Sequence, residues 1–405
     1  MITGAWFFTN SRYSPLLDQG FDGVVKITYN GYYGTGALLF GGRAVLTCAH
    51  LFSQNGVATA TASVSFDAIA GNQQVASSHI SIIPGFDATN DNNDLALVWL
   101  SSSAPITAER YTLYRSSYEI GQTMTMVGYG KPGSGDTGTL TTYSGDPLRL
   151  KASNQFDADI GTLANSFGSM LGWQPTTGTQ LVADFDNGTT TNDALGRLLN
   201  IPGAGLGLNE GLIAPGDIGG PAFINGKIAG VASYTASLHT PLTNPDIDTI
   251  ANSSFGEIAA WQRMSHYQQW IDQSLRADYS NAPTTPSEVQ KIVIEGNTGK
   301  TYAYFLLQFL GVRIDPNQAL SVDYTTRDGT ATSGQDYLPI NGKLVIYPNE
   351  SHIAIPVEII GDSLAEPDET FYLDVFNPVG GSFGEGIITL IAMRTIANDD
   401  GSLLA

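Results

Sequence analysis

The sequence predicts an all-β protein of two domains, and three observations lead to that prediction. The chain has 405 residues, which is more than one ordinary domain needs. It contains 46 glycines and only 14% charged residues. Its strand-like segments are short and bounded by Gly, Asn or Asp, as at 24–29, 44–47, 95–100 and 228–232. Many short strands of this kind indicate a barrel or a sandwich rather than a helical bundle.

The charge of the chain excludes some partners and favours others. Eighteen basic residues stand against 38 acidic ones, for a formal net charge of −20. Such a field repels phosphate backbones and attracts cations, so we expect no nucleic-acid partner. No apolar run approaches the roughly 18 residues that a membrane span needs. The single cysteine, Cys48, excludes an intramolecular disulfide.

A turn-rich stretch at 280–287, with two prolines, separates two strand-rich regions. Before it, the pattern over 259–275 predicts a helix with one buried face. The apolar residues of that face are Ala260, Met264, Tyr267, Ile271 and Leu275. The predicted organisation is a first domain at 1–276, a linker at 277–287, a second domain at 288–401 and a tail at 402–405.

Three segments of the first domain carry a recurrent motif order. A hairpin ends on His50, Asp94 opens an apolar strand, and residues 216–221 read Gly-Asp-Ile-Gly-Gly-Pro. In order and spacing these segments resemble the trypsin-like serine peptidases, in which the last motif is Gly-Asp-Ser-Gly-Gly-Pro. The resemblance covers residues 20–275. It implies a chymotrypsin-like double β-barrel with a C-terminal helix.

The resemblance assigns a role to each motif. His50 is the general base, and Asp94 holds its imidazole in the right tautomer. Gly216 leaves backbone N–H groups open as an oxyanion hole, and Asp217 shapes that turn from behind by pairing with a buried amine. Ile218, however, stands at the position of the nucleophilic serine. Isoleucine has no proton to give and no lone pair, so no acyl-enzyme can form.

Two explanations of Ile218 remain open. A β-branched side chain crowds a tight turn, which favours a natural loss over a designed inactivation. The first domain is then a pseudoprotease, and Ile218 packs towards His50. The alternative is an active secreted endopeptidase whose nucleophile was replaced for structural study. Cys48 could substitute for the missing nucleophile, because it lies two residues from His50. The motif, however, places a small buried residue at this position, which favours an inert core cysteine.

Substrate preference and maturation are weaker inferences from the same resemblance. The resemblance places Leu212 at the base of the family's specificity pocket and residues 233–235 at its wall. None of these residues is a carboxylate, so the pocket would favour substrates with apolar or small side chains. The Ile-Val-Gly-Gly-like start of the family is absent, and 21–25 is its nearest match. Residues 1–20 therefore have no assigned role. Their apolar run at 6–8 predicts donation of a strand to a neighbouring copy, and hence homo-assembly.

The second domain carries Thr-Arg-Asp-Gly-Thr at 326–330, an acidic turn at 362–369 and a terminal Asn-Asp-Asp. These segments resemble a Calx-beta domain, an immunoglobulin-like sandwich, over 288–401. The resemblance implies that Ca²⁺ is held by carboxylates at one end of the sandwich. The implied ligands are Glu295, Asp336, Asp362, Glu366, Glu369, Asp399 and Asp400. Gly361, Ser363 and Asn398 replace acidic positions of strong binders, so we expect one or two weakly held ions, or else a solvated acidic cluster without metal.

A second calcium-like spacing occurs in the first domain, at 184–188 and 192–193, where an Asn-Gly turn is an equally good explanation. The sequence as a whole predicts an extracellular bacterial protein that acts in binding, adhesion or assembly through a protein or peptide ligand. A module that reports calcium from the second domain to the first is a third interpretation. The start without a signal peptide and the small, apolar tail at 401–405 resemble a type I secretion substrate.

Overall fold

The computed structural model describes residues 1–53, 55–69, 71–201, 203 and 205–401. The predicted tail at 402–405 lies outside these residues. The contacts divide the chain into two compact units, Met1–Trp270 and Ile271–Ala405. Their boundary falls within helix α3 (Met264–Ala277), whereas the sequence places it at 276. None of the helices in the described ranges is long and apolar enough to cross a membrane.

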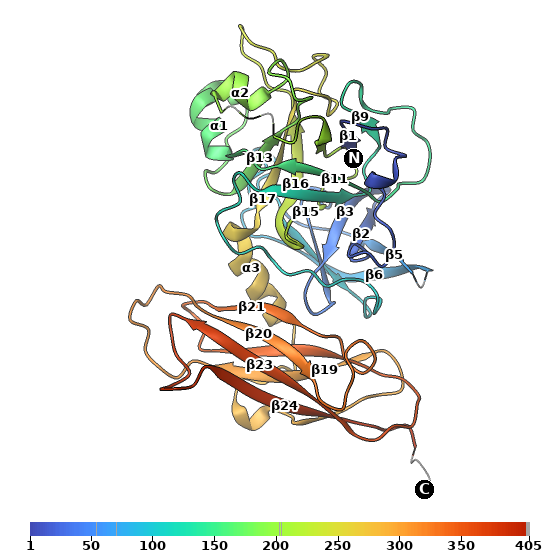
Figure 1. The fold of residues 1–405 in the computed structure, drawn as a ribbon, viewed down its shortest axis with the longest axis vertical. Coiled ribbons are helices and arrows are strands. Elements are labelled where there is room, and N and C mark those ends of the chain that lie inside the picture. The colour runs from blue at the N-terminus through green and yellow to red at the C-terminus, as the bar shows by residue number, and fades with distance from the viewer. Residues whose placement is uncertain (54, 70, 202, 204, 402–405) are drawn as a thin grey trace. The chain divides into compact units, whose positions relative to one another are not determined.

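Six strands close a barrel in the first unit (Figure 1). In order around the barrel they are β2 (Val24–Tyr29), β3 (Tyr32–Leu38), β4 (Ala44–Thr47), β7 (Ala96–Leu100), β6 (Gly71–Ile82) and β5 (Ser63–Ala68). Apolar side chains such as Ile27 and Val98 fill its interior, fully buried. Strand β4 pairs directly with β7, with Thr47 opposite Ala96, so the segment that follows β4 and the segment that precedes β7 come together.

The second half of this unit is a seven-stranded sheet. Its strand order is β11 (Leu150–Gln155), β8 (Thr123–Gly128), β15 (Pro221–Ile224), β16 (Lys227–Ala236), β17 (Ile258–Arg263), β13 (Gln180–Asp184) and β12 (Ala158–Asp159). The sheet is lined by helices α1 (Ile160–Phe167) and α2 (Ala194–Leu199). Barrel and half-barrel together confirm the predicted chymotrypsin-like, all-β architecture.

A small sheet brings distant parts of the first unit together. Strand β1 (Ile2–Thr3) lies between β9 (Gly133–Ser134) and β14 (Gly211–Leu212), and β10 (Gly138–Thr139) completes the sheet. Met1 and Ile2 are fully buried. The first residues of the chain are therefore an integral strand of the first unit.

The predicted helix at 259–275 is wrong in its first five residues. Ala259 to Arg263 belong to β17, which pairs with β13 and β16, and α3 begins at Met264. Strand partners far away in sequence decide this segment, and a local pattern does not show them. The apolar face of the helix itself is as predicted, because Met264, Tyr267 and Ile271 are all buried.

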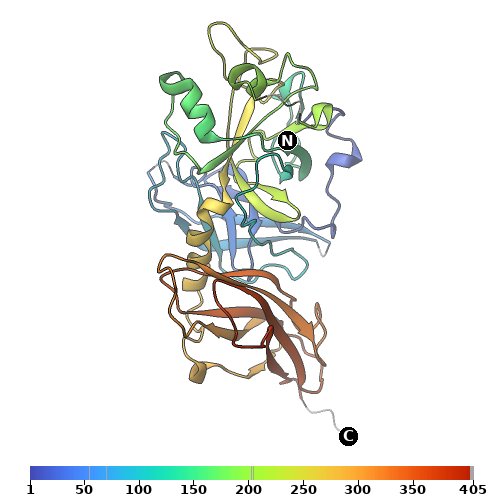
Figure 2. The same ribbon diagram turned by 60° about the vertical axis from the view of Figure 1, so that its left-hand side comes forward.

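The second unit is the predicted sandwich (Figure 2). One sheet has the order β18 (Ile292–Ile294), β24 (Thr389–Ala397), β23 (Glu369–Val379), β20 (Leu320–Asp328) and β21 (Asn341–Ile346). The other pairs β19 (Lys300–Gln308) with β22 (His352–Ile360). The core between them contains Tyr337 stacked on Phe371, with ring centroids 4.5 Å apart.

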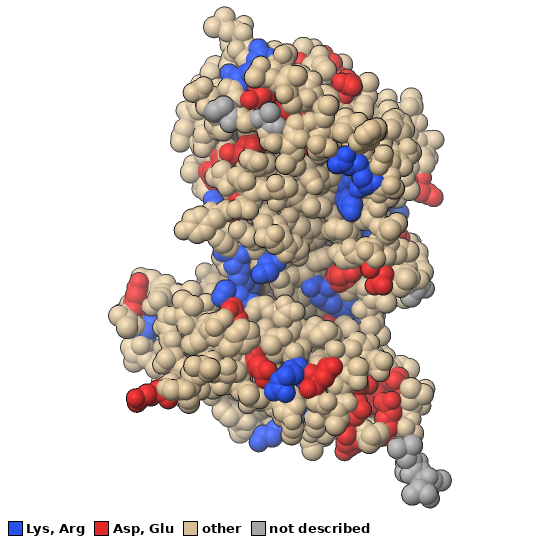
Figure 3. Space-filling view, viewed as in Figure 1, with Lys and Arg blue, Asp and Glu red and all other residues tan. Residues whose placement is uncertain are grey.

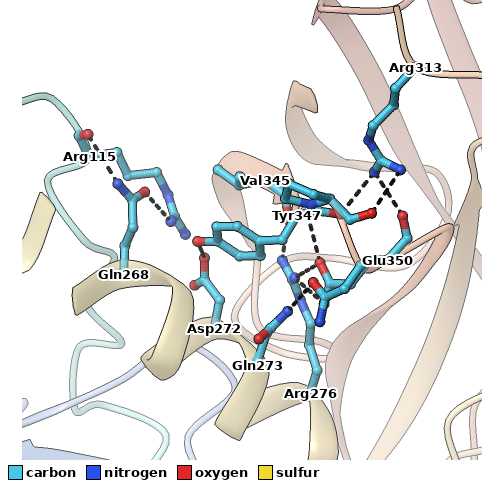
Figure 4. A network of polar contacts seen from close by, with 11 residues as sticks. Arg115, Gln268, Asp272, Gln273, Arg276, Arg313, Val345, Tyr347 and Glu350 are labelled. Carbon is cyan, nitrogen blue, oxygen red and sulfur yellow. Dashed lines mark hydrogen bonds and ion pairs between the residues drawn. The ribbon is translucent and has the colours of Figure 1, made fainter. Parts of the chain in front are cut away.

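Polar contacts fix the last turns of α3 to the sandwich within the second unit (Figure 4). The hydroxyl of Tyr347 donates a hydrogen bond of 2.6 Å to Asp272. The guanidinium of Arg276 pairs with Glu350 at 2.6 Å and donates to the carbonyl of Val345 at 2.7 Å. These residues of the helix therefore pack as part of the second unit.

Candidate active site and calcium site

His50 and Asp94 meet where β4 ends and β7 begins. The Nδ1 atom of His50 lies 2.7 Å from Oδ2 of Asp94, which is fully buried. The other oxygen of Asp94 accepts hydrogen bonds of 2.9 Å from the backbone N–H groups of Ala49 and His50. The pairing of the two strands thus brings the histidine and aspartate of the sequence motifs into contact and fixes the plane of the imidazole.

Ser233 contacts Asp94, whereas the sequence predicted it only as part of the wall of a specificity pocket. Its hydroxyl donates a hydrogen bond of 2.6 Å to Oδ2 of Asp94. It lies on β16 where the register against β17 shifts between Ala232 and Tyr234, and it is 1% exposed. The bulge directs this serine to the aspartate, and only the strand pairing reveals it.

Cys48 lies on the opposite side of the His50 ring from Asp94. Its Sγ is 4.0 Å from Nε2 of His50 and is fully buried. Burial favours the neutral imidazole, but the neighbouring Cys48 and Asp94 outweigh it and raise the pKa of His50.

Ile218 stands in the turn before β15, beside two left-handed glycines. Gly216 has a φ of +98° and Gly219 a φ of +85°, values that a side chain would strain. The carbonyl of Ile218 accepts a hydrogen bond of 2.9 Å from Thr35 N–H, and its side chain packs against the apolar core of the second sheet. The expected packing of Ile218 towards His50 stays a prediction.

Asp217 pairs with a buried amine, and that amine belongs to Met1. The α-amino nitrogen lies 2.7 Å from Oδ2 of Asp217, with the two side chains 0% and 1% exposed. Asp217 also accepts hydrogen bonds of 2.8 Å from Gly130 N–H and 2.9 Å from Ala214 N–H. Burial lowers the pKa of the amine, and the charge of Asp217 opposes this shift. The pair stabilises the turn that carries Gly216 and Ile218.

The sequence placed the nearest match to the family's N-terminal Ile-Val-Gly-Gly segment at 21–25. The ion pair between the Met1 amine and Asp217 corrects this prediction, because the inserted amine belongs to residue 1. Asp22 is buried in an ion pair with Arg149 at 2.7 Å, at the entry to the barrel. Residues 1–20, which had no assigned role, supply both the amine and strand β1. Strand donation to a second copy stays a prediction, and its accessible residues are Trp6 and Phe7, which are 58% and 57% exposed.

A pocket lies beside the Ile218 turn, whereas the predicted pocket base does not face solvent. Leu212 is fully buried in the core, on β14. The pocket has a volume of about 340 Å³ and is lined by Lys26, Tyr33, Lys131 and Tyr143, among others. A Cβ atom built on Gly216 would lie 2.6 Å from the ring of Tyr33, so the pocket adjoins the turn that carries Gly216 and Ile218.

All seven predicted calcium ligands gather at one end of the sandwich. Acidic side chains crowd near the last described residues of the chain (Figure 3). They form three overlapping groups in which the ligand atoms lie within 4.8 Å of one another. The groups are Glu295 with Asp399 and Asp400, Glu295 with Asp362 and Glu366, and Asp336 with Glu366 and Glu369.

The charges at this end of the sandwich repel one another. Burial, followed by the charges of Asp362 and Glu366, raises the pKa of Glu295 to about 7. Burial and the neighbouring Asp336 raise the pKa of Glu369 to about 7. The Oδ2 atom of Asp400 is buried without a hydrogen-bond partner. An all-carboxylate donor set with such an orphaned oxygen fits Ca²⁺, which takes six to eight oxygen ligands.

Comparisons with known proteins agree with this division. The family model described as Trypsin matches residues 17–157, and that of the Calx-beta domain matches residues 308–400. The sodium/calcium exchanger Calx of Drosophila melanogaster is 36% identical over 91 residues, which are 22% of this chain and 9% of the exchanger. Sodium/calcium exchanger 2 of Rattus norvegicus is 35% identical over 97 residues, 21% of this chain and 10% of that protein.

A third similar protein is the adhesion G-protein coupled receptor V1 of Danio rerio, 32% identical over 109 residues, which are 25% of this chain and 2% of the receptor. The chain thus spans at most 10% of the length of these three relatives. The two family matches identify a trypsin-family domain, at 17–157, that is followed in the chain by a C-terminal Calx-beta domain.

Proposed function

We propose that the chain is a secreted peptidase-fold protein that binds its ligand without cleaving it, joined to a calcium-binding domain. The observation that carries this proposal is Ile218, which replaces the nucleophile within a turn whose other parts are in place. The Met1 amine sits on Asp217 at 2.7 Å, and His50 faces Asp94 at 2.7 Å. Without a hydroxyl or thiol at position 218, the site has nothing that can attack a carbonyl.

The ligand that we propose is an acidic segment of a protein or peptide. The pocket beside the Ile218 turn is lined by Lys26 and Lys131 together with tyrosine rings. In the described part of the chain, neither lysine has a carboxylate partner within 4.0 Å. Two unpaired cations beside aromatic rings make this pocket locally positive within an acidic chain, and this local charge favours a negatively charged ligand.

The C-terminal domain is proposed to bind one or two calcium ions weakly, as suits a protein exposed to millimolar extracellular calcium. Its role would lie in adhesion or assembly outside a bacterial cell, with export by a type I route. Homo-assembly would use Trp6 and Phe7, which are more than half exposed. Titration calorimetry with CaCl₂ on the chelator-treated chain tests the calcium proposal, and no heat at millimolar calcium would refute it.

Catalytic inactivity is tested on the unaltered chain with fluorogenic peptides and with a fluorophosphonate probe. We expect neither hydrolysis nor labelling. Hydrolysis that disappears in a His50→Ala variant would refute the proposal, because it would show that this histidine drives cleavage without a serine at position 218.

Ligand binding is tested with a panel of acidic and neutral peptides in fluorescence anisotropy. Lys131→Glu should weaken the binding of acidic peptides about tenfold or more by reversing a charge in the pocket. Lys227→Glu is the matched control, because Lys227 is an exposed lysine on β16 outside the pocket. Equal losses in the two variants would place the ligand elsewhere.

A second candidate function is that of an active serine endopeptidase whose nucleophile has been replaced. The contacts of Asp94 with His50 and Ser233, and of Asp217 with Met1, favour it, because they correspond to a complete catalytic frame. The codon for residue 218 in the natural gene decides between the two candidates. A serine codon establishes the endopeptidase, and an isoleucine codon establishes the non-cleaving protein.

A further inference from the structure

Five carboxylates cluster in the first unit, and none of them is among the predicted calcium ligands of the C-terminal domain. They come from the end of β13, from the loop that follows it, and from the segments next to β12 and β14. The members are Asp157, Asp184, Asp186, Asp193 and Glu210. All except Asp157 are at most 7% exposed, and Asp186 is fully buried.

No basic side chain compensates this charge. In the described ranges, none of the five carboxylates takes part in an ion pair. Arg197, the nearest basic residue in sequence to Asp193, donates instead to the backbone carbonyls of Thr191 and Asn244. Buried carboxylates without counter-charges are costly, so the cluster must hold either protons or a cation.

Backbone groups satisfy part of the cluster. Glu210 accepts hydrogen bonds from the N–H groups of Asp186 and Leu206, at 3.0 and 2.8 Å. Asp184 accepts one of 2.8 Å from Leu195 N–H. These bonds tie the loop between β13 and β14 to the carboxylates, so the cluster is part of the fold rather than a solvated surface.

One oxygen of the cluster remains without any partner. Asp186 accepts a hydrogen bond of 2.5 Å from Gly188 N–H through Oδ1, but its Oδ2 is buried and unpaired. The charge of Asp186 raises the pKa of both Asp157 and Glu210, to about 7 and about 8, in addition to the larger effect of burial. Hydrogen bonds link the segments that carry these carboxylates, because the N–H of Asp186 donates to Glu210 and the N–H of Asp184 donates to Oδ2 of Asp157 at 3.1 Å.

We propose that these five carboxylates form a divalent-cation site within the first unit, and that its ion is calcium. The donors are all hard oxygens on an irregular loop, a combination that suits Ca²⁺ better than the strict octahedron of Mg²⁺. Within the described residues, no three of these carboxylates have oxygens within 4.8 Å of one another, unlike the C-terminal groups. The proposed site therefore requires these side chains to rotate inwards when the ion binds.

The position of the site gives the ion a structural task. Glu210 directly precedes β14, whose partner strand β1 begins next to the Met1 amine. Asp184 ends β13, and Asp193 caps α2 through a hydrogen bond of 2.6 Å to Gly196 N–H. An ion here would hold the loop between these elements, and with it the frame behind the Ile218 turn.

Hydrogen exchange on the full chain locates the ion without any substitution. With millimolar CaCl₂ in place of chelator, we expect peptides from 184–210 to exchange about tenfold more slowly or better. Peptides from 288–401 report the C-terminal site separately, so the two calcium proposals fail or succeed independently. Exchange at 184–210 that calcium leaves unchanged would overturn the inference. MgCl₂ as a second arm should give little protection there.

Ion counting by calorimetry adds a second readout. Asp186→Asn should bind one calcium ion fewer than the unaltered chain, whereas Asp136→Asn, at an exposed aspartate of the same unit, should bind the same number. If the cluster holds only protons, Asp186→Asn will leave the ion count unchanged and will stabilise the chelator-treated chain above neutral pH. That result would also overturn the inference.

Discussion

Two regions of the molecule respond differently to substitution. The catalytic frame comprises His50, Asp94 and Asp217 with their contacts, and the calcium end is the end of the sandwich that carries the seven predicted calcium ligands. In the frame, His50 contacts Asp94 and Asp217 contacts the Met1 amine, and our proposal attributes the loss of the reaction to a single side chain, Ile218. At the calcium end, Gly361 and Asn398 already replace acidic positions, and three overlapping carboxylate groups still form. Covalent catalysis depends on a single atom, whereas a metal site built from shared ligands weakens gradually.

The two regions also differ in how their charges are balanced. Asp94 and Asp217 have partners at 2.6 to 2.9 Å in the folded chain itself. Glu295 and Glu369 instead have pKa values raised to about 7 by burial and by other carboxylates. The contacts of the frame therefore form within the chain itself, whereas the carboxylates at the end of the sandwich need protons or a cation to offset their repulsion.

The largest expected effect comes from breaking the paired region. Asp217→Asn leaves the buried Met1 amine without its counter-charge and should destabilise the chain by about 3–5 kcal/mol. Urea unfolding followed by tryptophan fluorescence measures the loss. Asp146→Asn, at an exposed aspartate of the same unit, should change stability by no more than about 0.5 kcal/mol. Equal stabilities of the two variants would show that the amine does not pair with Asp217.

A smaller effect is expected at the shared ligands. Glu295→Gln should weaken calcium binding about tenfold, because Glu295 is 4% exposed and belongs to two of the three carboxylate groups. Glu385→Gln is the control, since this exposed glutamate lies outside those groups. Calorimetry on both variants reads the difference. An unchanged affinity for Glu295→Gln would remove this residue from the site.

The smallest effect is the pH dependence of the calcium-free chain. Because their pKa values are raised, Glu295 and Glu369 keep their protons in the folded chain at pH values where they lose them in the unfolded chain. This difference begins above pH 4.5, the ordinary pKa of a glutamate side chain. Stability in chelator should therefore fall as pH rises from about 4.5 through 7, and level off above that. Calcium replaces the protons and should flatten the curve.

Thermal unfolding between pH 5 and 8 measures this dependence, with and without calcium. The cluster at Asp157 and Glu210 acts with the same sign, since the pKa values of both are also raised. A Glu295→Gln, Glu369→Gln double variant isolates the C-terminal share, and its chelator curve should be flatter. A double variant with the same slope as the unaltered chain would assign the whole dependence to the first unit.

Motifs predicted the parts of the molecule that depend on local sequence. The motif residues lie in turns and strand ends whose residue order is distinctive. The structure brings His50 to Asp94, and it brings the seven predicted calcium ligands to one end of the sandwich. The amine of Met1 escaped prediction because its burial depends on strand β1 pairing with residues 133 and 212.

The roles of two further segments also depend on distant partners. Ser233 reaches Asp94 through a bulge in β16, and 259–263 are held in a strand by β13 and β16 although their local pattern is helical. The orphaned oxygen of Asp186 is visible only after the loop around it has folded. Long-range pairing and burial thus account for what the sequence did not show.

The central claim, that only the nucleophile is missing from the first domain, is tested most directly by the Ile218→Ser variant with a fluorophosphonate probe. The claim predicts one covalent label per chain, at a rate at least about ten-thousand-fold above that of the unaltered chain. The label should be lost when His50→Ala is added. A folded variant, with unfolding behaviour like that of the unaltered chain, that takes no label would contradict the claim.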